Sequence, residues 1–564
     1  MNNYFTNKTA GSGSNTRYWI FAIIVLTLIV YLPSFNNEFI NYDDQRLITE
    51  NPLIKEFSAQ NIKIWFTEFV DDVYQPLTML SWGIDHATGG LNPFMFHFTN
   101  LLLHLLNTFL VFRFIYLLVR RTDMAVIIAT LFGVHTFHVE SVVWMSERKD
   151  LLYAFFFLAS LVVYLRYINN NKTKYLIFSL LLFLLSLLSK GQGVTLAVTL
   201  IIIDWFKGRG LLSKKVILEK IPFFVIALVF GIIAILGHKA SGTLEEEAVV
   251  YEFHERFAFA CYGFTQYIIK SIIPYELSAF YPYPVKTGND IPSLYWLYLI
   301  PVIIIFLLTL FSLKRYKYIA FGLMFFIINI VLVLKLFQVQ IGYFIMTDRY
   351  SYISSIGIFF IIASFFMYLS DRKVRYKLPA AIILITYITS LWVFTFSRTQ
   401  EWKDSITVWS DVISKYPDLR WAWNKRGLAK KEQGDYQGAI ADYNRAIEIK
   451  PYSPAYTNRG VAKGMLGDFR GAVADFDKAI NIKPYDHDAY NNRAVAKGNL
   501  GDLEGAIEDL GMAIHLKPDF ASAYFTRAQA YIRLKDTEKA CNDLHKAYEL
   551  GYKQAEVEMR RYCR

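Results

Sequence analysis

Residues 458–484 read NRGVAKGMLGDFRGAVADFDKAINIKP, and residues 492–518 read NRAVAKGNLGDLEGAIEDLGMAIHLKP. Similar units lie on both sides, so the chain after about residue 405 repeats with a period of 33–34 residues. Small residues at fixed positions allow paired helices to pack closely, and a proline ends the second helix of each pair. The positions in register are Ala439, Ala472, Ala506 and Ala540; Ala446, Ala479, Ala513 and Ala547; and Pro417, Pro451, Pro484 and Pro518.

This period and pattern resemble the tetratricopeptide repeat (TPR). Four full units agree, with 405–415 as a degenerate first helix and 552–563 as a closing helix, so we expect an α-solenoid over 398–564. One arginine and one aspartate recur in register in every unit: Arg426 and Asp442, Arg459 and Asp475, Arg493 and Asp509, Arg527 and Asp543. We expect these residues to form ion pairs between the two helices of a unit; the alternative is a charged ladder that contacts a ligand.

Polar side chains on the first helices are better candidates for ligand contact, namely Asn424, Asn458 and Asn491. Such arrays usually bind extended peptides or protein partners on a concave face. Because the array shows no catalytic constellation, we expect it to recruit a protein. Cys541 and Cys563 can pair if this domain is extracytoplasmic, and two free thiols remain the alternative.

Toward the N-terminus the composition changes. The chain is 54% hydrophobic and only 19% charged, and nearly all the apolar excess precedes about residue 397. This excludes a disordered, fibrous or simply soluble protein. We expect an all-α chain, with a polytopic membrane domain over 1–397 and a soluble domain over 398–564. The net charge of +11 resides largely in short loops between apolar segments, which favours a role in membrane orientation over nucleic-acid binding.

Twelve apolar segments lie between about residue 18 and residue 397, and charge decides which of them cross. With the N-terminus in the cytoplasm, the acidic loops 35–96 and 239–256, the latter with Glu245–Glu247, face outward. If 257–273 also crossed, the basic clusters at 314–317 and 372–377 would face outward too, against the positive-inside rule. The stretch 251–273 is amphipathic. Eleven spans therefore fit better, and they place the C-terminal repeats on the extracytoplasmic side.

Ionisable residues beside spans are functional candidates because they are costly there. Asp43 and Asp44 follow the first span, where a carboxylate can act as a general base; a helix cap or a solvated acidic loop is the alternative. His135, His138 and Glu140 follow the third span and can hold a metal or be structural.

Basic residues form a second group of candidates. Arg148 and Lys149 suit a phosphate, Lys190 interrupts an apolar stretch, and Arg349 lies in the string Asp348-Arg-Tyr350. Under the eleven-span arrangement all these residues, acidic and basic, face the same side of the membrane.

Several strings in order resemble the transmembrane-and-TPR-containing (TMTC) proteins. They are Tyr42-Asp-Asp44, Gln75-Pro-Leu77-Thr, Phe96-His-Phe98, His135 to Glu140, Arg148-Lys-Asp150, Lys190, Asp348-Arg-Tyr-Ser-Tyr352 and the passage through Trp402 into the repeats. The resemblance covers nearly the whole chain. It implies the GT-C glycosyltransferase fold of the protein O-mannosyltransferases: eleven spans, a catalytic acid in the first lumenal loop, a polyprenyl-phosphate sugar donor and lumenal repeats.

The chain departs from that pattern at three places. The family often has arginine where Gln75 stands, His-Pro where His135-Thr136 stands, and Lys-Glu where Lys190-Gly191 stands. These differences concern positions expected to touch the sugar donor or the acceptor, so the sugar or acceptor preference can differ.

The resemblance and the charges together predict a membrane glycosyltransferase that moves mannose or another hexose. Asp43 or Asp44 takes the proton of a Ser or Thr hydroxyl, which attacks the anomeric carbon with inversion. Arg349, with Arg148, Lys149 or Lys190, stabilises the phosphate leaving group, while His135, His138, Glu140 and Gln75 position acceptor or donor. The scheme requires no cofactor or metal, although metal use stays open. The alternatives are a non-catalytic membrane-anchored TPR scaffold and, less well supported, a transporter.

Overall fold

The computed structural model describes residues 13–71, 73–240, 251–286, 288, 290–336, 344–372 and 374–563. The predicted acidic segment Glu245–Glu247 lies outside these residues. The chain divides into two compact units, the membrane unit Met1–Asp404 and the repeat unit Ser405–Arg564. The division follows Asp404 rather than residue 397, because the last apolar helix, α17 (Val374–Glu401), continues without a break to Glu401.

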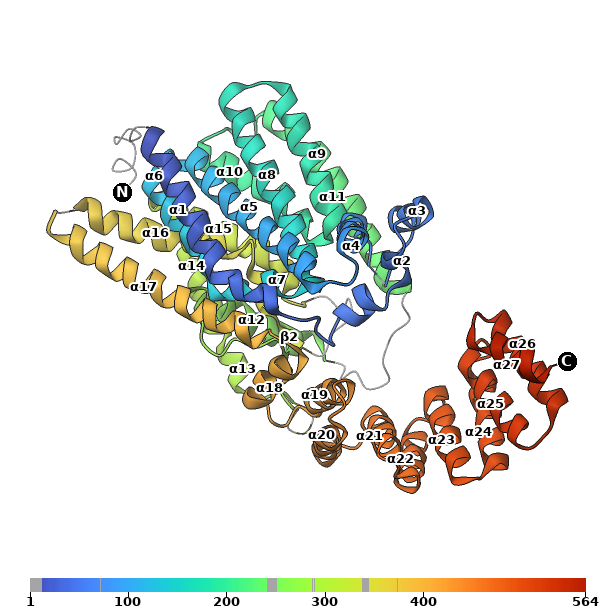
Figure 1. Ribbon diagram of the computed structural model, residues 1–564. Helices are drawn as coiled ribbons and strands as arrows, with labels where there is room; N and C mark the ends of the chain where they lie inside the picture. Colours follow the sequence, from blue (N-terminus) through green and yellow to red (C-terminus); the bar gives the residue numbers. More distant parts are fainter. Residues whose placement is uncertain are drawn as a thin grey trace. The chain divides into compact units, whose positions relative to one another are not determined.

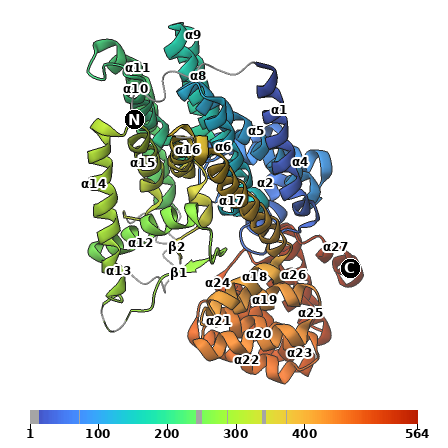
Figure 2. The same cartoon turned by 90° about the vertical axis from the view of Figure 1, so that its left-hand side faces the viewer.

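Both units are almost entirely helical, as expected from the sequence (Figure 1). The helices of the membrane unit are α1 (Gly13–Tyr31), α2 (Pro52–Lys55), α3 (Ala59–Thr67), α4 (Pro76–Gly89), α5 (Pro93–Val119), α6 (Thr122–Val134), α7 (Val139–Val143), α8 (Arg148–Asn170), α9 (Thr173–Ser189), α10 (Thr195–Lys207), α11 (Lys214–Ala240), α12 (Phe253–Ile272), α13 (Leu294–Leu297), α14 (Leu299–Arg315), α15 (Lys317–Ile330), α16 (Ser355–Arg372) and α17. The two short strands β1 (Tyr281–Pro282) and β2 (Phe344–Met346) pair antiparallel close to α12 (Figure 2).

Within the described residues, seven helices are long and apolar enough to cross a membrane. The count becomes eight if α6 and the segment Thr136–Val143, bent by 52° at their junction, form one broken span. Two shorter helices, α9 and α15, are also apolar. The chain is therefore a polytopic helical membrane protein, and the count of eleven crossings stays a prediction because several of those helices fall below the usual spanning length.

The segment 257–273, which is predicted not to cross, forms most of α12 and is not among the seven candidate spans. Its charged side chains Glu255 and Lys270 are buried, whereas Phe253, Phe257 and Ile269 are exposed. Glu255 pairs with Lys286 at 2.8 Å, and Lys270 donates to the carbonyl of Tyr275 at 2.7 Å. The helix is thus amphipathic, with its polar side toward the protein.

Close packing in the membrane unit relies on small residues. A Cβ added to Gly322 of α15 would lie 2.6 Å from the carbonyl oxygen of Gly357 in α16, so only glycine allows this approach. Ser160 of α8 and Ser179 of α9 donate to each other's carbonyls at 2.7 and 3.1 Å. These contacts hold together the helices whose ends carry the candidate site.

The repeat unit consists of successive antiparallel helix pairs. Its helices are α18 (Ser405–Lys415), α19 (Arg420–Glu432), α20 (Tyr436–Ile449), α21 (Ser453–Met465), α22 (Phe469–Ile482), α23 (His487–Leu500), α24 (Leu503–Leu516), α25 (Ala521–Arg533), α26 (Thr537–Glu549) and α27 (Gln554–Tyr562). The second helix of each pair begins at an aspartate cap, as where Asp468 accepts from the N–H of Gly471 at 2.8 Å. The repeated alanines are buried between the helices. The prediction of four helix pairs flanked by single helices is confirmed.

The recurrent arginines and aspartates form the predicted ion pairs. In each unit the guanidinium makes two hydrogen bonds to the aspartate, for example from Arg493 to Asp509 at 2.9 and 2.6 Å. The corresponding pairs are Arg426 with Asp442, Arg459 with Asp475, and Arg527 with Asp543. Because these carboxylates are buried, the pairs join the two helices of a unit and are not a free charged ladder.

Candidate functional site

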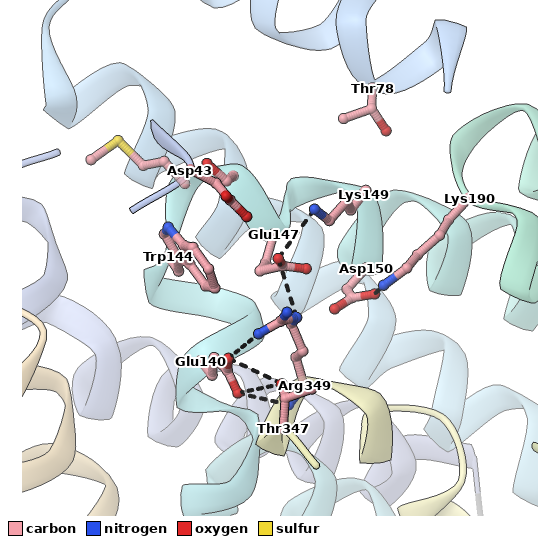
Figure 3. Close-up of polar contacts among 12 residues, drawn as sticks. Asp43, Thr78, Glu140, Trp144, Glu147, Lys149, Asp150, Lys190, Thr347 and Arg349 are labelled. Atoms are coloured by element: carbon pink, nitrogen blue, oxygen red, sulfur yellow. Dashed lines mark hydrogen bonds and ion pairs between the residues drawn. The ribbon is translucent and has the colours of Figure 1, made fainter. Parts of the chain in front are cut away.

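The candidate site lies where four non-consecutive segments of the membrane unit meet. These are the loop after α1, the turns from α7 into the first turn of α8, the α9–α10 junction, and η7 (Asp348–Ser351) after β2. Figure 3 shows Asp43 on one side of Glu147 and Lys149, Lys190 on the other, and Arg349 with Glu140 beyond them. The structure thus brings together five residues that the sequence marked separately: Asp43, Lys149, Lys190, Glu140 and Arg349.

Asp43 and Asp44 have different environments although they are neighbours. The Asp43 side chain is 26% exposed and lies 3.9 Å from the exposed guanidinium of Arg46. Asp44 is completely buried. It accepts from the N–H of Ile40 at 2.8 Å, from the N–H of Ser146 at 2.9 Å and from the Ser146 hydroxyl. Asp44 therefore ties the first loop to the turn before α8, and Asp43 is the carboxylate that a substrate can reach.

Burial also changes the acidity of Asp44. Desolvation raises the pKa of this carboxyl to about 7, and the hydrogen bonds from Ile40 and Ser146 act in the opposite direction. A buried carboxyl with such a pKa is a candidate general acid or base. Both oxygens of Asp44, however, already accept hydrogen bonds from other groups of the protein, three in all.

Arg349 is held by two buried carboxylates. One terminal nitrogen, Nη1, contacts Glu140 at 2.5 Å, and Nε lies 3.2 Å from Glu147. Glu140 also accepts from the Arg349 N–H at 2.9 Å and from the Thr347 hydroxyl at 3.2 Å. Through these contacts Glu140 fixes the orientation of Arg349.

Two lysines stand beside this pair. Lys149 lies 3.2 Å from Glu147, so Glu147 is shared between Lys149 and Arg349. Lys190 contacts Asp150, and its ammonium lies 5.4 Å from the centroid of the Tyr350 ring. Both lysine side chains are 17% exposed, so each ammonium is partly open to a ligand. The arrangement presents three cations whose positions are set by buried acids.

Arg148 points elsewhere, although it is the neighbour of Lys149. It is fully buried and contacts Asp85, the side-chain oxygen of Asn100 at 2.8 Å and the carbonyl of Phe96 at 2.7 Å. These contacts join the start of α8 to α4 and α5. All its nitrogens thus have partners inside the protein, and the structure does not bring Arg148 to the group around Arg349.

The two predicted histidines lie among helices and contact protein groups. His138 is buried; its Nδ1 lies 2.9 Å from the carbonyl of Phe132 and its Nε2 lies 3.0 Å from the Ser355 hydroxyl. His135 is buried as well, and its Nδ1 accepts from the N–H of Phe137 at 3.1 Å. Among the described residues no three acidic, histidine or cysteine side chains gather as metal ligands. The contacts of both histidines are those of structural residues.

Gln75 is the residue before α4 and is buried. Its carbonyl accepts from the N–H groups of Thr78 and Met79 at 3.1 and 3.2 Å, so it closes the first turn of that helix. Thr78 donates to the carbonyl of Ser189, next to Lys190, at 3.0 Å. This start of α4 is thereby joined to the Lys190 segment.

Aromatic residues and two further acids complete the site. Tyr42 stacks on Trp144, with ring centroids 4.9 Å apart, and the Arg349 guanidinium lies 5.1 Å from the Trp144 ring. The sequence interpretation gave no role to Glu147 or Asp150, although they position all three cations. The signal for them is the run of four charged residues, Glu147 to Asp150, at the start of an apolar helix.

In the repeat unit, two of the three predicted ligand-face asparagines touch each other. The amide of Asn458 in α21 donates to the side-chain oxygen of Asn424 in α19 at 3.1 Å. Asn424 is buried, and Asn491 of α23 is half-buried. Their role in binding a protein stays a prediction.

The family model described as "Tetratricopeptide repeat" matches residues 421–453, 453–486, 487–520 and 521–550. Residues 421–550 are therefore tetratricopeptide repeats. One solved structure with a similar chain is the crystal structure of MamA, which is 24% identical and covers 27% of this chain and 90% of its own, with a TM-score of 0.25.

Several curated relatives are named protein O-mannosyl-transferases. The protein O-mannosyl-transferase Tmtc1 of Drosophila melanogaster is 33% identical over 186 residues, which are 30% of this chain and 21% of the relative. The resemblance to the TMTC proteins is confirmed. A second relative, the protein O-mannosyl-transferase F38B6.6 of Caenorhabditis elegans, is 23% identical over 448 residues, or 76% of this chain and 62% of the relative. Each of the two matches thus spans less than two thirds of the relative's own length.

Proposed function

We propose that this chain is a membrane glycosyltransferase that transfers a hexose from a polyprenyl-phosphate donor to Ser or Thr hydroxyls of a protein. The names of its relatives favour mannose as the sugar. The observation that carries the proposal is the juxtaposition of one accessible carboxylate, Asp43, with three cations, Lys149, Lys190 and Arg349, at the helix ends (Figure 3). A carboxylate beside a cationic site is what transfer from a lipid phosphate to a hydroxyl requires.

In this scheme Asp43 accepts the proton of the acceptor hydroxyl. The hydroxyl oxygen forms a bond to the anomeric carbon while the bond from that carbon to the phosphate oxygen breaks. The electron pair of the broken bond remains on the phosphate, which leaves as polyprenyl phosphate. One displacement inverts the configuration of the sugar, as in other inverting GT-C enzymes. No cofactor or metal takes part in these steps.

The cations bind the phosphate and stabilise the charge that it gains. Arg349 is preorganised because Glu140 and Glu147 hold its guanidinium and Trp144 lies against it. Lys149 and Lys190 are likewise fixed by Glu147 and Asp150. Charges already aimed at the leaving group need not reorganise during the reaction, which is the source of their catalytic effect. Arg148, Asp44, Gln75 and the two histidines support this arrangement from within the fold.

The repeat unit recruits the acceptor protein in this proposal and raises its effective concentration near the site. Its Cys541, within α26, and Cys563, the residue after α27, form a disulfide. Disulfides persist mainly in oxidising compartments, so this bond supports the extracytoplasmic placement of the repeats derived from the loop charges.

The proposal is tested by incubating purified full-length protein with polyprenyl-phosphate mannose and an acceptor protein that co-purifies through residues 405–564. The acceptor should gain one hexose, and the Asp43→Asn variant should not support this gain. If the wild type binds the acceptor but transfers no sugar from any polyprenyl-phosphate hexose, the chain acts as a membrane-anchored scaffold instead.

A further inference from the structure

Lys335 is a half-buried cation that the sequence pattern did not single out. It follows the short turn at the end of α15, and its backbone φ is 55°, in the left-handed region that non-glycine residues rarely adopt. Its ammonium donates to the carbonyl of Phe344 at 3.1 Å and lies 3.6 Å from the centroid of the Phe344 ring. An unusual backbone conformation in a confined place is typical of functional positions.

Among the described residues, Lys335 differs from the other cations around the site because no acidic side chain pairs with it. Lys149, Lys190 and Arg349 each contact a carboxylate. For Lys335, the contacts within the described part of the chain are the Phe344 carbonyl and ring. An ammonium that is partly removed from water and lacks a counter-ion is unfavourable, and a ligand that supplies negative charge would relieve this cost.

The same aromatic ring connects Lys335 to the candidate site. The Arg349 guanidinium lies 5.5 Å from the Phe344 centroid, so the two cations share one ring. Desolvation, together with the positive charge of Arg349, lowers the pKa of Lys335 to about 7. Two cations that repel each other across one ring form a natural place for an anion.

We propose that Lys335 is a further donor-binding residue, whose ammonium joins Arg349 in contacting the phosphate of the lipid-linked sugar. This inference rests on the proposed function and extends it from three cations to four. The bound phosphate supplies the missing counter-charge of Lys335. The anionic lipid therefore binds more tightly to the protein in which Lys335 is protonated. Donor binding and protonation of Lys335 are thus coupled.

Other charged groups around Lys335 must be separated from it in a pH experiment. Arg349 on η7 faces it and is itself paired with Glu140 and Glu147. From α12, Arg256 donates to the carbonyl of the next residue, Leu336, at 3.2 Å. Arginine stays protonated at all relevant pH values. Asp44 titrates in the same range as Lys335, but it is equally present in every Lys335 variant.

The test measures the dissociation constant of farnesyl phosphate, a short prenyl monophosphate, for full-length protein between about pH 6 and about pH 8.5, a range that brackets the titration. As the pH rises across this range, the affinity of the wild type should fall by about tenfold more than the affinity of Lys335→Arg, because the arginine keeps its charge. Lys335→Met should bind about tenfold more weakly than wild type at the acidic end and equally at the alkaline end. Because the arginine of Lys335→Arg stays charged, the pH dependence of the affinity of this variant comes from the phosphate and from all other titrating groups.

Identical pH profiles for wild type and Lys335→Arg, together with unchanged binding by Lys335→Met, would overturn the role of Lys335 while leaving the proposed function intact. If wild type binds farnesyl phosphate at no pH and transfers no sugar, the proposed function itself fails. Should Lys335→Met not fold, the comparison of wild type with Lys335→Arg still decides the question.

Discussion

Replacing Asp43 by asparagine should abolish transfer without unfolding the protein. The change removes the negative charge of the one carboxylate that we assign as the general base for the acceptor hydroxyl. General-base catalysis typically contributes about 10²–10⁴-fold to a rate, so kcat should fall by about that factor. This corresponds to an increase of about 3–5 kcal/mol in the activation free energy.

The folding free energy should change little, because Asp43 is partly exposed. Its ion pair partner, Arg46, lies 3.9 Å away with 59% of its side chain exposed. Such surface pairs contribute at most about 1 kcal/mol. The Asp43→Asn variant should therefore unfold at nearly the wild-type temperature in detergent.

Asp44→Asn is the matched control, because it makes the same chemical change one residue away. Asp44 accepts on both oxygens, from Ile40 on one and from Ser146 on the other. In either orientation the asparagine amide turns its NH₂ group toward one of these donors. A buried donor without an acceptor costs about 1–3 kcal/mol. This variant should lose stability, and its remaining folded fraction should keep transfer activity.

The assay measures initial rates of hexose transfer from polyprenyl-phosphate mannose at saturating acceptor, together with thermal unfolding of each variant. The role of Asp43 as the general base is refuted if Asp43→Asn keeps more than about a tenth of the wild-type kcat, since a general base contributes more than this. The same role is refuted if Asp44→Asn loses all activity at an unchanged unfolding temperature, because Asp44 would then be the base.

Three further predictions follow from other contacts. Arg349→Lys should reduce kcat/KM by at least about tenfold, because one ammonium cannot contact both Glu140 and Glu147 as the guanidinium does; rates near wild type would contradict its assigned role. The double change Cys541→Ser and Cys563→Ser should destabilise the repeat unit by about 3 kcal/mol, as measured by denaturant unfolding, because it releases the loop that the disulfide closes; an unchanged midpoint would contradict this. Burial raises the pKa of Asp44 to about 7, so the folded state binds this proton more tightly than the unfolded state; thermal stability should fall as pH rises from about 4 to about 7, and Asp44→Asn should flatten that dependence.

The repeat architecture could be predicted from the sequence because its determinants are local. Each unit contains its own aspartate cap, its small residues and its arginine–aspartate pair, and the period repeats them in register. Pairing of Arg493 with Asp509 follows from the spacing of two adjacent helices alone. No knowledge of distant segments is needed for such a fold.

The candidate site could be predicted only in part, because side-chain direction decides which charges converge. Arg148 and Lys149 are adjacent in the sequence, yet one is buried against α4 and α5 and the other lies beside Glu147. Asp43 and Asp44 differ in the same way. Successive residues near a helix start project to different sides, and sequence alone does not show which side faces the site.

The supporting residues were harder still to predict. His138 occurs in a string that can bind metal, but its contacts are a carbonyl and a serine from a helix more than two hundred residues away. Lys335 has no motif around it, and its relation to Arg349 comes from a ring that both cations share. Such relations depend on tertiary packing, which local patterns do not encode.

All these predictions depend on the proposed transfer of a hexose from a lipid phosphate to a protein. Its most direct test is mass spectrometry of the acceptor protein and of the released lipid after reaction with purified wild-type protein and polyprenyl-phosphate mannose. We expect equal amounts of acceptor carrying one added hexose and of free polyprenyl phosphate, with neither product formed by Asp43→Asn. Release of polyprenyl phosphate without a modified acceptor, or no release by a wild-type protein that binds its acceptor, would contradict hexose transfer by this chain.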